Sequence, residues 1–379
     1  MRLKIPLPNS VFRIGLLLMI IKVFLSLSNM MELPYTADMI LSVVASLFLV
    51  ISIFQKRFPM KTLLLFGLII IIGFITSVRT GNMMMFIAIL TCIAVCGEDL
   101  EETVRFLLNA ESLLLLLVVV ISFIMHVMGY SMLIRVSKQM LYGFGFSHPN
   151  VFACVLTNVF AMYLWLHFDT VRPINLAAIM LSSIVTFLIT DSRTGLLVTL
   201  FLIAIIALCR NQEKAHRILK YSAMWALPVL ALGFYLICKV FSSGNVLAQL
   251  VDMGLSGRIR FSAYSLERFG IAFFGQNLSN VKVKWDEFWQ LSGITFDNIY
   301  TYLMVTQTVW LAVIAYLFYR VAKQGGAKQY IFIIAWALYG IAEIHVINPF
   351  LFFPLLMTTC LFNREEEEEP DEENVEGAE

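Results

Sequence analysis

Two short segments of the chain carry arginines in settings that suit the binding of a phosphate group. Arg193 lies in the segment DSRTG (residues 191–195), and Arg258 and Arg260 lie in SGRIR (residues 256–260). A guanidinium group is permanently charged and presents a planar fork of N–H donors that matches phosphate oxygens. The glycine before Arg258 permits close approach of the backbone to a ligand. These arginines are therefore candidates for binding a phosphate or diphosphate.

Each arginine also has an ordinary structural explanation. Arg193 could pair with Asp191 or extend to lipid headgroups, and Arg258 and Arg260 could be surface charges of a folded loop. Arg268 follows eight residues after Arg260, so a helix would place the two about two turns apart on a similar face. Arg268 is for that reason a further candidate for substrate binding.

A second group of residues could accept a proton. His148 lies in the segment GFGFSHPN, where the following proline disfavours helical backbone at the histidine. Asn150, which ends that segment, is expected to be the N-cap of the next helix, whose N–H donors would also suit an anion. Glu343 and His345 stand at the edge of an apolar run, where a polar side chain is costly unless it is paired or used. His345, Glu343 and His148 are therefore candidate catalytic bases, although Glu343 could simply pair with an arginine.

The residues that follow the long loop add weaker candidates. Asp297 and Asn298 open an apolar run and are expected to be mainly helix-capping residues, although they could also contact substrate. Trp285, Trp289 and Tyr300 could stack on sugars, or they could belong to the aromatic belt of a membrane interface.

Motifs of several common enzyme classes do not occur in the sequence. It has no Walker A, HExxH, GxSxG, GxGxxG or DxD-type pattern, which disfavours ATP hydrolysis, zinc proteolysis, serine hydrolysis and metal-dependent sugar transfer. Cys92 and Cys96 are one helical turn apart but lack a second pair of zinc ligands. We therefore expect neither a metal nor another cofactor.

Composition places these residues in a membrane protein. Of the 379 residues 60% are hydrophobic and only 14% are charged, against roughly 25% charged in soluble domains. Residues 365–379 hold ten of the 26 acidic residues and no basic one, so the rest of the chain has 27 basic against 16 acidic residues. The apolar runs are continuous, which favours helices over a β-barrel.

The chain is therefore predicted to be an all-α, polytopic membrane protein with about 12 spans, or 10 to 12 if the shortest are partial. The candidate spans are residues 11–29, 38–54, 62–78, 83–97, 105–128, 150–168, 174–190, 195–209, 221–241, 297–319, 329–345 and 349–363. The predicted regions are a membrane domain of about nine spans (1–241), a partly helical extracytoplasmic loop (242–296), a membrane domain of three spans (297–363) and an acidic cytoplasmic tail (364–379).

The distribution of lysine and arginine predicts the orientation, because short cytoplasmic loops retain positive charge. Basic residues gather in the connections that lie on the same side as the N-terminus, such as those around Lys56, Arg172, Arg210 and Lys323. Both termini are therefore predicted to be cytoplasmic. Arg193 falls on the outer side, against this bias, and so needs a local reason to be there.

These features together resemble one family. The chain has many spans, GFSHPN before one span, DSRTG after the next, Gly-Arg in a large outer loop, Asp-Asn opening a later span and Asn-Pro near the end. This combination resembles the Wzy-type polysaccharide polymerases and the related O-antigen ligases. The motifs cover about 50 residues of this sequence, and the topology extends the likeness across nearly the whole membrane body.

The resemblance implies a function in the bacterial cytoplasmic membrane. Such enzymes join oligosaccharide repeat units carried on undecaprenyl pyrophosphate at the outer face of the membrane, beside a flippase and a chain-length regulator, and they bind no nucleic acid. The reading of the residues fits this chemistry. Arg193 and Arg258, supported by Arg260, would stabilise the departing pyrophosphate, and His345, Glu343 or His148 would activate the acceptor hydroxyl.

Two other functions are compatible with the sequence. An O-antigen-ligase-type enzyme would transfer the glycan to a different acceptor. A flippase or secondary transporter would need polar groups near the middle of the membrane and broken helices there. The polar candidates in this chain instead gather at the outer ends of the spans, which favours the polymerase.

Overall fold

The computed structural model describes residues 7–29, 34–131, 133–136, 139–210, 212–278, 281, 289 and 296–362, so the predicted acidic tail lies outside the described residues. The first half of the chain comprises α1 (Leu7–Leu27), α2 (Tyr35–Phe54), α3 (Met60–Thr80), α4 (Met84–Val95), α5 (Leu100–Val127), the antiparallel strands β1 (Leu133–Val136) and β2 (Gln139–Tyr142), and α6 (Pro149–Leu166). The second half comprises α7 (Pro173–Thr190), α8 (Arg193–Cys209), α9 (Glu213–Ser242), α10 (Val246–Gly254), α11 (Arg258–Phe269), α12 (Ile299–Gln324), α13 (Ala327–Tyr339) and the 3-10 helices η1 (His345–Ile347) and η2 (Phe353–Leu361).

Eight of the helices are long and apolar enough to cross a membrane. They are α1, α2, α3, α5, α6, α7, α9 and α12. Each contains at least 18 residues, and about 20 helical residues span a hydrocarbon core of roughly 30 Å. Many of their large apolar side chains face outward, as expected where the solvent is lipid. The chain is thus an all-α, multi-pass membrane protein.

The predicted number of about twelve spans is not confirmed, because four of the predicted runs form shorter elements. The runs at 83–97 and 195–209 form α4, of 12 residues, and α8, of 17 residues. The run at 329–345 is helical only as far as Tyr339, and the run at 349–363 forms the 3-10 helix η2. The apolar composition of these four runs predicted that they are buried. It did not predict how long the helix in each run is.

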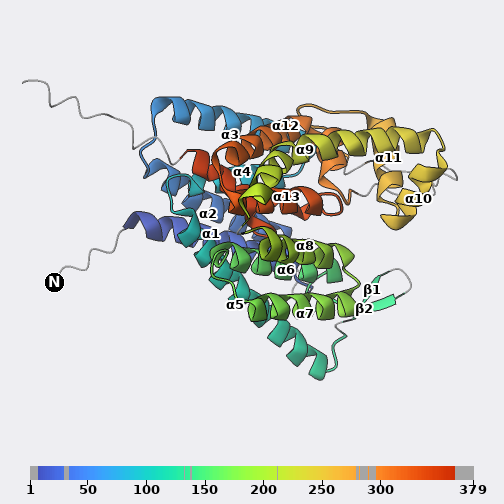
Figure 1. Cartoon of the computed structure of the whole chain (residues 1–379). Coiled ribbons are helices and arrows are strands. Elements are labelled where there is room, and N and C mark those ends of the chain that lie inside the picture. Colours follow the sequence, from blue (N-terminus) through green and yellow to red (C-terminus); the bar gives the residue numbers. More distant parts are fainter. Residues whose placement is uncertain are drawn as a thin grey trace, which may run out of the picture.

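The helices run back and forth between two ends of the bundle (Figure 1). One end carries the β-hairpin, α10 and α11, and we call it the hairpin end. There Asn29 N donates to Gly145 O at 2.8 Å, and Ile299 N donates to Gly340 O at 2.9 Å. At the opposite end Lys56 Nζ lies 2.9 Å from Glu98 Oε1. Segments far apart in sequence therefore meet at both ends, and those of the predicted outer motifs meet at the hairpin end.

The predicted loop 242–296 contains two helices in its described part. α10 begins after Asn245, whose Oδ1 accepts from Leu247 N at 2.9 Å, and α11 begins after Gly257, which has a positive φ of 84°. Both helices contact α9 at the hairpin end (Figure 1). This segment places Arg258 at the start of α11, facing the ends of the membrane helices.

One membrane-spanning helix is interrupted. Gln307 in α12 has a non-helical φ of −165° and ψ of 65°. The segment after α11 lies beside this break, since Ala272 N donates to Met304 O at 3.0 Å and Thr308 N donates to Ala272 O at 2.8 Å. Backbone groups that the break releases are therefore hydrogen-bonded within the protein, as membrane burial requires.

Candidate functional site

A cavity of about 240 Å³ lies at the hairpin end and brings together several of the residues singled out from the sequence. Arg193, Arg258, His148 and Asn150 all line it. We call it the arginine cavity; its remaining lining residues are Leu141, Thr190, Asp191, Ser192, Thr194 and Ser256. Two guanidinium groups from distant parts of the chain thus border one space that is otherwise lined mainly by polar side chains.

The turn between α7 and α8 positions Arg193. Asp191 ends α7 with φ 54° and ψ 22°, a left-handed conformation that Asp tolerates better than most residues. Gly195 lets α8 approach α6, because a Cβ at this position would lie 2.9 Å from Thr157 Oγ1. Asp191 and Gly195 are the first and last residues of DSRTG. Together they place Arg193 as the first residue of α8, beside the start of α6.

Arg193 remains able to bind an anion. Its Nε lies 3.7 Å from Asp191 Oδ1, which is the ion pair that the sequence suggested as an alternative role. The two side chains are 67% and 46% exposed, and exposed pairs of this kind contribute only about 0–1 kcal/mol. A doubly charged phosphate group could therefore displace the Asp191 carboxylate from the Arg193 guanidinium, or bind beside it.

Arg258 carries hydrogen-bonding capacity that the protein leaves unused. Its Nη1 donates to Leu255 O at 3.2 Å, but its buried Nε has no hydrogen-bond partner among the described residues. The preceding turn is fixed by Asp252, whose Oδ1 accepts from Arg260 N at 2.9 Å. A buried donor without a partner costs about 1–3 kcal/mol. Arg258 as a whole is only half-buried and lines the cavity, so an anion there can approach its guanidinium group, although not at the buried Nε.

His148, and not Asn150, is the N-cap of α6, so that part of the sequence analysis was wrong. His148 has extended backbone, with φ −147° and ψ 143°, and its Nδ1 accepts from Asn150 N at 3.1 Å. Pro149 takes the first helical position, where its missing N–H and fixed φ are favourable. The residue before proline must then be the cap. His148 Nδ1 is occupied as an acceptor in this role, which leaves Nε2 as the nitrogen that carries the proton.

Three titratable groups surround this part of the site. Burial raises the pKa of Glu343 to about 7; the positive charge of Arg258 opposes this rise and the negative charge of Asp297 adds to it. Burial lowers the pKa of His148, against the opposing charge of Asp297. Burial also lowers the pKa of His345, and the positive charge of His148 lowers it further. Glu343, His345, His148, Asp297 and Arg258 therefore form one electrostatically connected group at the hairpin end.

Six predicted site residues do not line the arginine cavity: Glu343, His345, Asp297, Arg260, Arg268 and Asn298. Arg260 lies with its guanidinium 5.9 Å from the ring centre of Phe261. Arg268 is exposed in the last turn of α11. Asn298 is buried, caps α12 by accepting from Thr301 N at 2.8 Å, and donates to Ser262 Oγ at 2.6 Å. The structure thus gives Asn298 the capping role that the sequence also suggested.

The aromatic residues suggested for sugar stacking are unavailable where the structure describes them. Tyr300 is fully buried, stacks on Phe234 with ring centres 5.7 Å apart, and donates its hydroxyl to Ala337 O. Trp289 is buried against Phe241, with ring centres 6.1 Å apart. Trp285 lies outside the described residues. The sugar-stacking prediction is therefore wrong for Tyr300 and Trp289.

Sequence reasoning missed several polar residues that the fold buries or places in cavities. Four residues with hydroxyl groups line the arginine cavity: Thr190, Ser192, Thr194 and Ser256. Their closeness to Arg193 and Arg258 in the sequence is the feature from which they could have been predicted. A second group was less visible. Glu111 and Asp38 lie in or beside apolar runs and find partners on other helices, Asn158 and Lys22.

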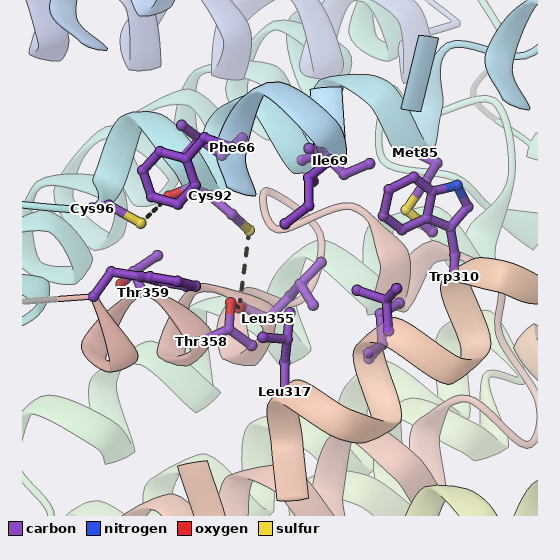
Figure 2. A pocket seen from close by; sticks show the side chains of 15 residues that line it. Phe66, Ile69, Met85, Cys92, Cys96, Trp310, Leu317, Leu355, Thr358 and Thr359 are labelled. Carbon is purple, nitrogen blue, oxygen red and sulfur yellow. Dashed lines mark hydrogen bonds between the residues drawn. The ribbon is translucent and has the colours of Figure 1, made fainter. Parts of the chain in front are cut away.

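A small apolar cavity lies away from this site, between α3, α4, α12 and η2 (Figure 2). It measures about 60 Å³, and Phe66, Ile69, Met85 and Trp310 form part of its wall. Cys92 Sγ contacts Leu355 O at 3.9 Å there. Its lining offers no group of charges, so we assign the candidate chemistry to the arginine cavity.

The described residues contain no cluster of three or more His, Cys, Asp or Glu side chains that could hold a metal ion. The arginine cavity instead combines two guanidinium groups, a histidine with a defined tautomer and several hydroxyl groups. Comparisons with protein-family models, with curated proteins and with solved structures found no match to this chain.

Proposed function

We propose that the protein polymerises oligosaccharide repeat units linked to undecaprenyl pyrophosphate, as a glycosyltransferase in the bacterial cytoplasmic membrane. The observation that carries the proposal is the convergence of Arg193 and Arg258 on one cavity next to His148 and close to the membrane helices. The resemblance of GFSHPN, DSRTG and the outer Gly-Arg to the polymerase family supports it from the sequence.

The reaction places its largest charge change on the diphosphate. A hydroxyl of the acceptor sugar attacks the anomeric carbon of the donor, the bond from that carbon to the diphosphate oxygen breaks, and the electron pair leaves with the diphosphate. Arg193 and Arg258 would bind the departing group more tightly as its charge grows. Each charge-assisted hydrogen bond contributes about 1.5–3 kcal/mol, so two or three of them can accelerate the step by a factor of about 10³ or more. The scheme assigns this work to the arginines and needs no metal.

The proton of the attacking hydroxyl passes to a base. Of the three candidate bases, Glu343 has the most suitable pKa. A carboxyl group with a pKa of about 7 is present as the carboxylate in a large fraction of molecules at neutral pH. His345 remains an alternative, since its lowered pKa keeps it neutral and able to accept a proton. His148 stays a prediction as well, but it could accept a proton only if Nδ1 gave up its hydrogen bond from Asn150 N. Arg260, Arg268, Asp297 and Asn298 stay predictions for substrate contact, without a place in the arginine cavity.

The pH dependence of elongation separates these bases. The pKa of Glu343 is raised from 4.5 to about 7, so the carboxylate is lost as the pH falls through 7. We expect the rate at limiting substrate to fall about tenfold per pH unit below this point. Replacement of Glu343 by Gln should remove most activity throughout the range. A profile that stays flat below pH 6.5 would assign the base to a histidine instead.

The charges of the two ends support an orientation with the arginine cavity outside. Basic residues gather at the end opposite the cavity: Lys56, Arg57, Lys61, Arg105, Arg172, Arg210, Lys214, Arg217, Lys220, Arg320, Lys323 and Lys328. Because cytoplasmic connections are enriched in Lys and Arg, we assign that end and both termini to the cytoplasm. The hairpin end then faces the compartment in which surface polysaccharide is assembled.

Two alternative functions differ in what they need from the structure. An O-antigen-ligase-type transfer would use the same arginines with a different acceptor. Only the reaction products therefore distinguish a ligase from a polymerase. A flippase or transporter would use a broken helix near the middle of the membrane. The break at Gln307 in α12 is such a feature, but the backbone around it is bonded to residues 272–276, which favours a structural role for the break.

Purified protein with lipid-linked repeat units tests the function directly. We expect a ladder of products that differ by one repeat, formed equally well in the presence of EDTA, because the arginines take the place of a metal. The measurement is gel electrophoresis of the labelled glycan. A single transfer product with a separate acceptor would indicate a ligase, unchanged substrate would point to transport, and loss of the ladder in EDTA would overturn the metal-free scheme.

Replacement of Arg193 by Lys tests whether the fork of donors matters beyond the charge. Lysine keeps the positive charge but presents a point charge with no planar pair of donors. We expect elongation to remain at least about tenfold below that of the natural chain, the loss of one charge-assisted hydrogen bond. Full activity of this variant would show that Arg193 supplies only a diffuse positive charge.

A further inference from the structure

A cavity of about 690 Å³ lies between α1, α2 and α4. Its wall carries a stripe of polar side chains at positions where membrane helices usually present apolar ones. On α2, Asp38, Ser42 and Ser46 follow one another at four-residue spacing, and on α1 Lys22 and Ser26 do the same. Residues at this spacing share one face of a helix. We call this space the α1–α2 cavity.

The charges in the stripe neutralise each other. Lys22 Nζ lies 3.3 Å from Asp38 Oδ1, and Ser26 donates its hydroxyl to the same carboxylate oxygen. Tyr35 and His345 are the remaining titratable side chains among the described lining residues, and the lowered pKa of His345 favours its neutral form. A diphosphate finds no uncompensated cation here, unlike in the arginine cavity. Hydroxyl groups and a paired carboxylate are instead suited to the hydroxyls of an uncharged sugar.

The α1–α2 cavity adjoins the arginine cavity. Leu27, which lines the α1–α2 cavity, accepts a hydrogen bond from Ser147 N at 2.8 Å, and the next residue, His148, lines the arginine cavity. His345 lines the α1–α2 cavity from the other side. An occupant of this cavity can therefore reach one candidate base while a diphosphate occupies the neighbouring space.

The cavity also opens toward lipid. Met39, Val43 and Leu47 line it and are 47%, 53% and 54% exposed on the surface of a membrane-spanning helix. A substrate confined to the bilayer can approach from this side. The site therefore suits a molecule that carries uncharged sugars and is delivered within the membrane.

From these features we propose that the α1–α2 cavity binds the sugar end of the acceptor, with the Lys22–Asp38 pair and the serine stripe on its hydroxyl groups and His345 next to the hydroxyl that attacks. This inference rests on the proposed function, and it assigns the two cavities to the two substrates: the diphosphate of the donor to the arginine cavity, and the uncharged end of the acceptor to the α1–α2 cavity.

Protection of introduced cysteines tests the assignment. Ser42→Cys reports on the α1–α2 cavity, Thr194→Cys on the arginine cavity, and Ser243→Cys, at an exposed position at the end of α9, is the control outside both. Each variant is purified, checked for elongation, and labelled with a small charged thiol reagent, with the labelling of the unaltered chain subtracted. The probes are lipid-linked repeat units extracted from the producing cells, and undecaprenyl pyrophosphate without sugars.

We expect the repeat unit to slow the labelling of Ser42→Cys several-fold, while undecaprenyl pyrophosphate slows only Thr194→Cys and neither probe affects Ser243→Cys. Equal protection of Ser42→Cys by undecaprenyl pyrophosphate would overturn the inference in favour of a site for the lipid chain, and so would the absence of any protection by the repeat unit. Failure of undecaprenyl pyrophosphate to protect Thr194→Cys would count against the proposed function, independently of the result at Ser42→Cys.

A cavity-filling variant supplies an independent readout. Ser46→Phe should abolish elongation and leave the protection of Thr194→Cys by undecaprenyl pyrophosphate unchanged, because it blocks only the acceptor. Leu64→Phe on the exposed, lipid-facing surface of α3 is the matched control and should elongate normally. Normal elongation by Ser46→Phe would contradict the assignment.

Discussion

Replacement of either cavity-lining arginine, Arg193 or Arg258, by Ala should reduce the rate of chain elongation by about 10²- to 10³-fold, the usual effect of removing one donor that stabilises transition-state charge. Each side chain is expected to bind the departing diphosphate from its own side of the arginine cavity. The measurement is the length distribution of the glycan in cells that carry the variant, with lipid-linked single repeats quantified in the membrane fraction. Single repeats should accumulate while long polymer disappears.

Arg79→Ala is the matched control for these variants. Arg79 lies in the last turn of α3 at the hairpin end, where it is exposed and outside the arginine cavity. Its replacement removes the same charge from the same end of the protein, so a general electrostatic effect would appear in all three variants. Long polymer made by Arg193→Ala at normal protein level would remove the basis of the proposed function.

The double variant adds information about cooperation. If both guanidinium groups bind one diphosphate in the transition state, the loss in Arg193→Ala, Arg258→Ala should differ from the product of the single losses, because residues that act on one group are coupled. Strictly independent effects would indicate that the two arginines bind different groups of the substrate.

The proximity of Arg193 and Arg258 could be anticipated because of a simple physical constraint. Helices that cross a membrane must place successive connections at alternate ends. Counting spans therefore assigned 191–195 and 256–260 to the same side, and His148 and Glu343 with them. The structure brings Arg193, Arg258 and His148 to one cavity and connects Glu343 to Arg258 electrostatically. Their chemical roles stay predictions.

Other features depend on contacts that local sequence does not encode. The capping role passed from Asn150 to His148 because Pro149 fixes the first helical position. The break in α12 is accompanied by hydrogen bonds to residues 272–276, a segment whose own course could not be foreseen. Apolar composition alone also could not distinguish the 3-10 helix η2 from a membrane-spanning α-helix. In each case a tertiary or backbone constraint decided between conformations that the same residues allow.

Burial in the membrane also explains why polar residues missed in the sequence come in pairs. Glu111 on α5 is fully buried, and its Oε2 accepts from Asn158 Nδ2 on α6 at 2.9 Å. Asn158 Oδ1 in turn accepts from Phe353 N at 2.9 Å, at the start of η2. One amide side chain thus joins three elements, and it satisfies a backbone N–H that is buried away from solvent.

Replacement of Asn158 by Leu should therefore destabilise the protein strongly. The substitution keeps a similar volume but leaves both the Glu111 carboxyl group and the Phe353 N–H without their partner, at a cost of about 1–3 kcal/mol for each buried group. We expect the detergent-solubilised protein to lose its monodisperse chromatographic peak at a temperature several degrees lower than the unaltered chain. Protein level in the membrane should fall as well.

Two further variants distinguish this network from a general sensitivity of the membrane helices. Ser183→Ala removes a buried hydroxyl that, among the described residues, bonds only to Ile179 O of its own helix. That carbonyl keeps its helical partner, so stability should change little. Glu111→Gln keeps an oxygen that can accept from Asn158 and should be much milder than Asn158→Leu. If Glu111→Gln proves as destabilising as Asn158→Leu, the carboxyl group contributes something an amide cannot, and the stability of this region would then depend on its ionisation or on a proton that it donates.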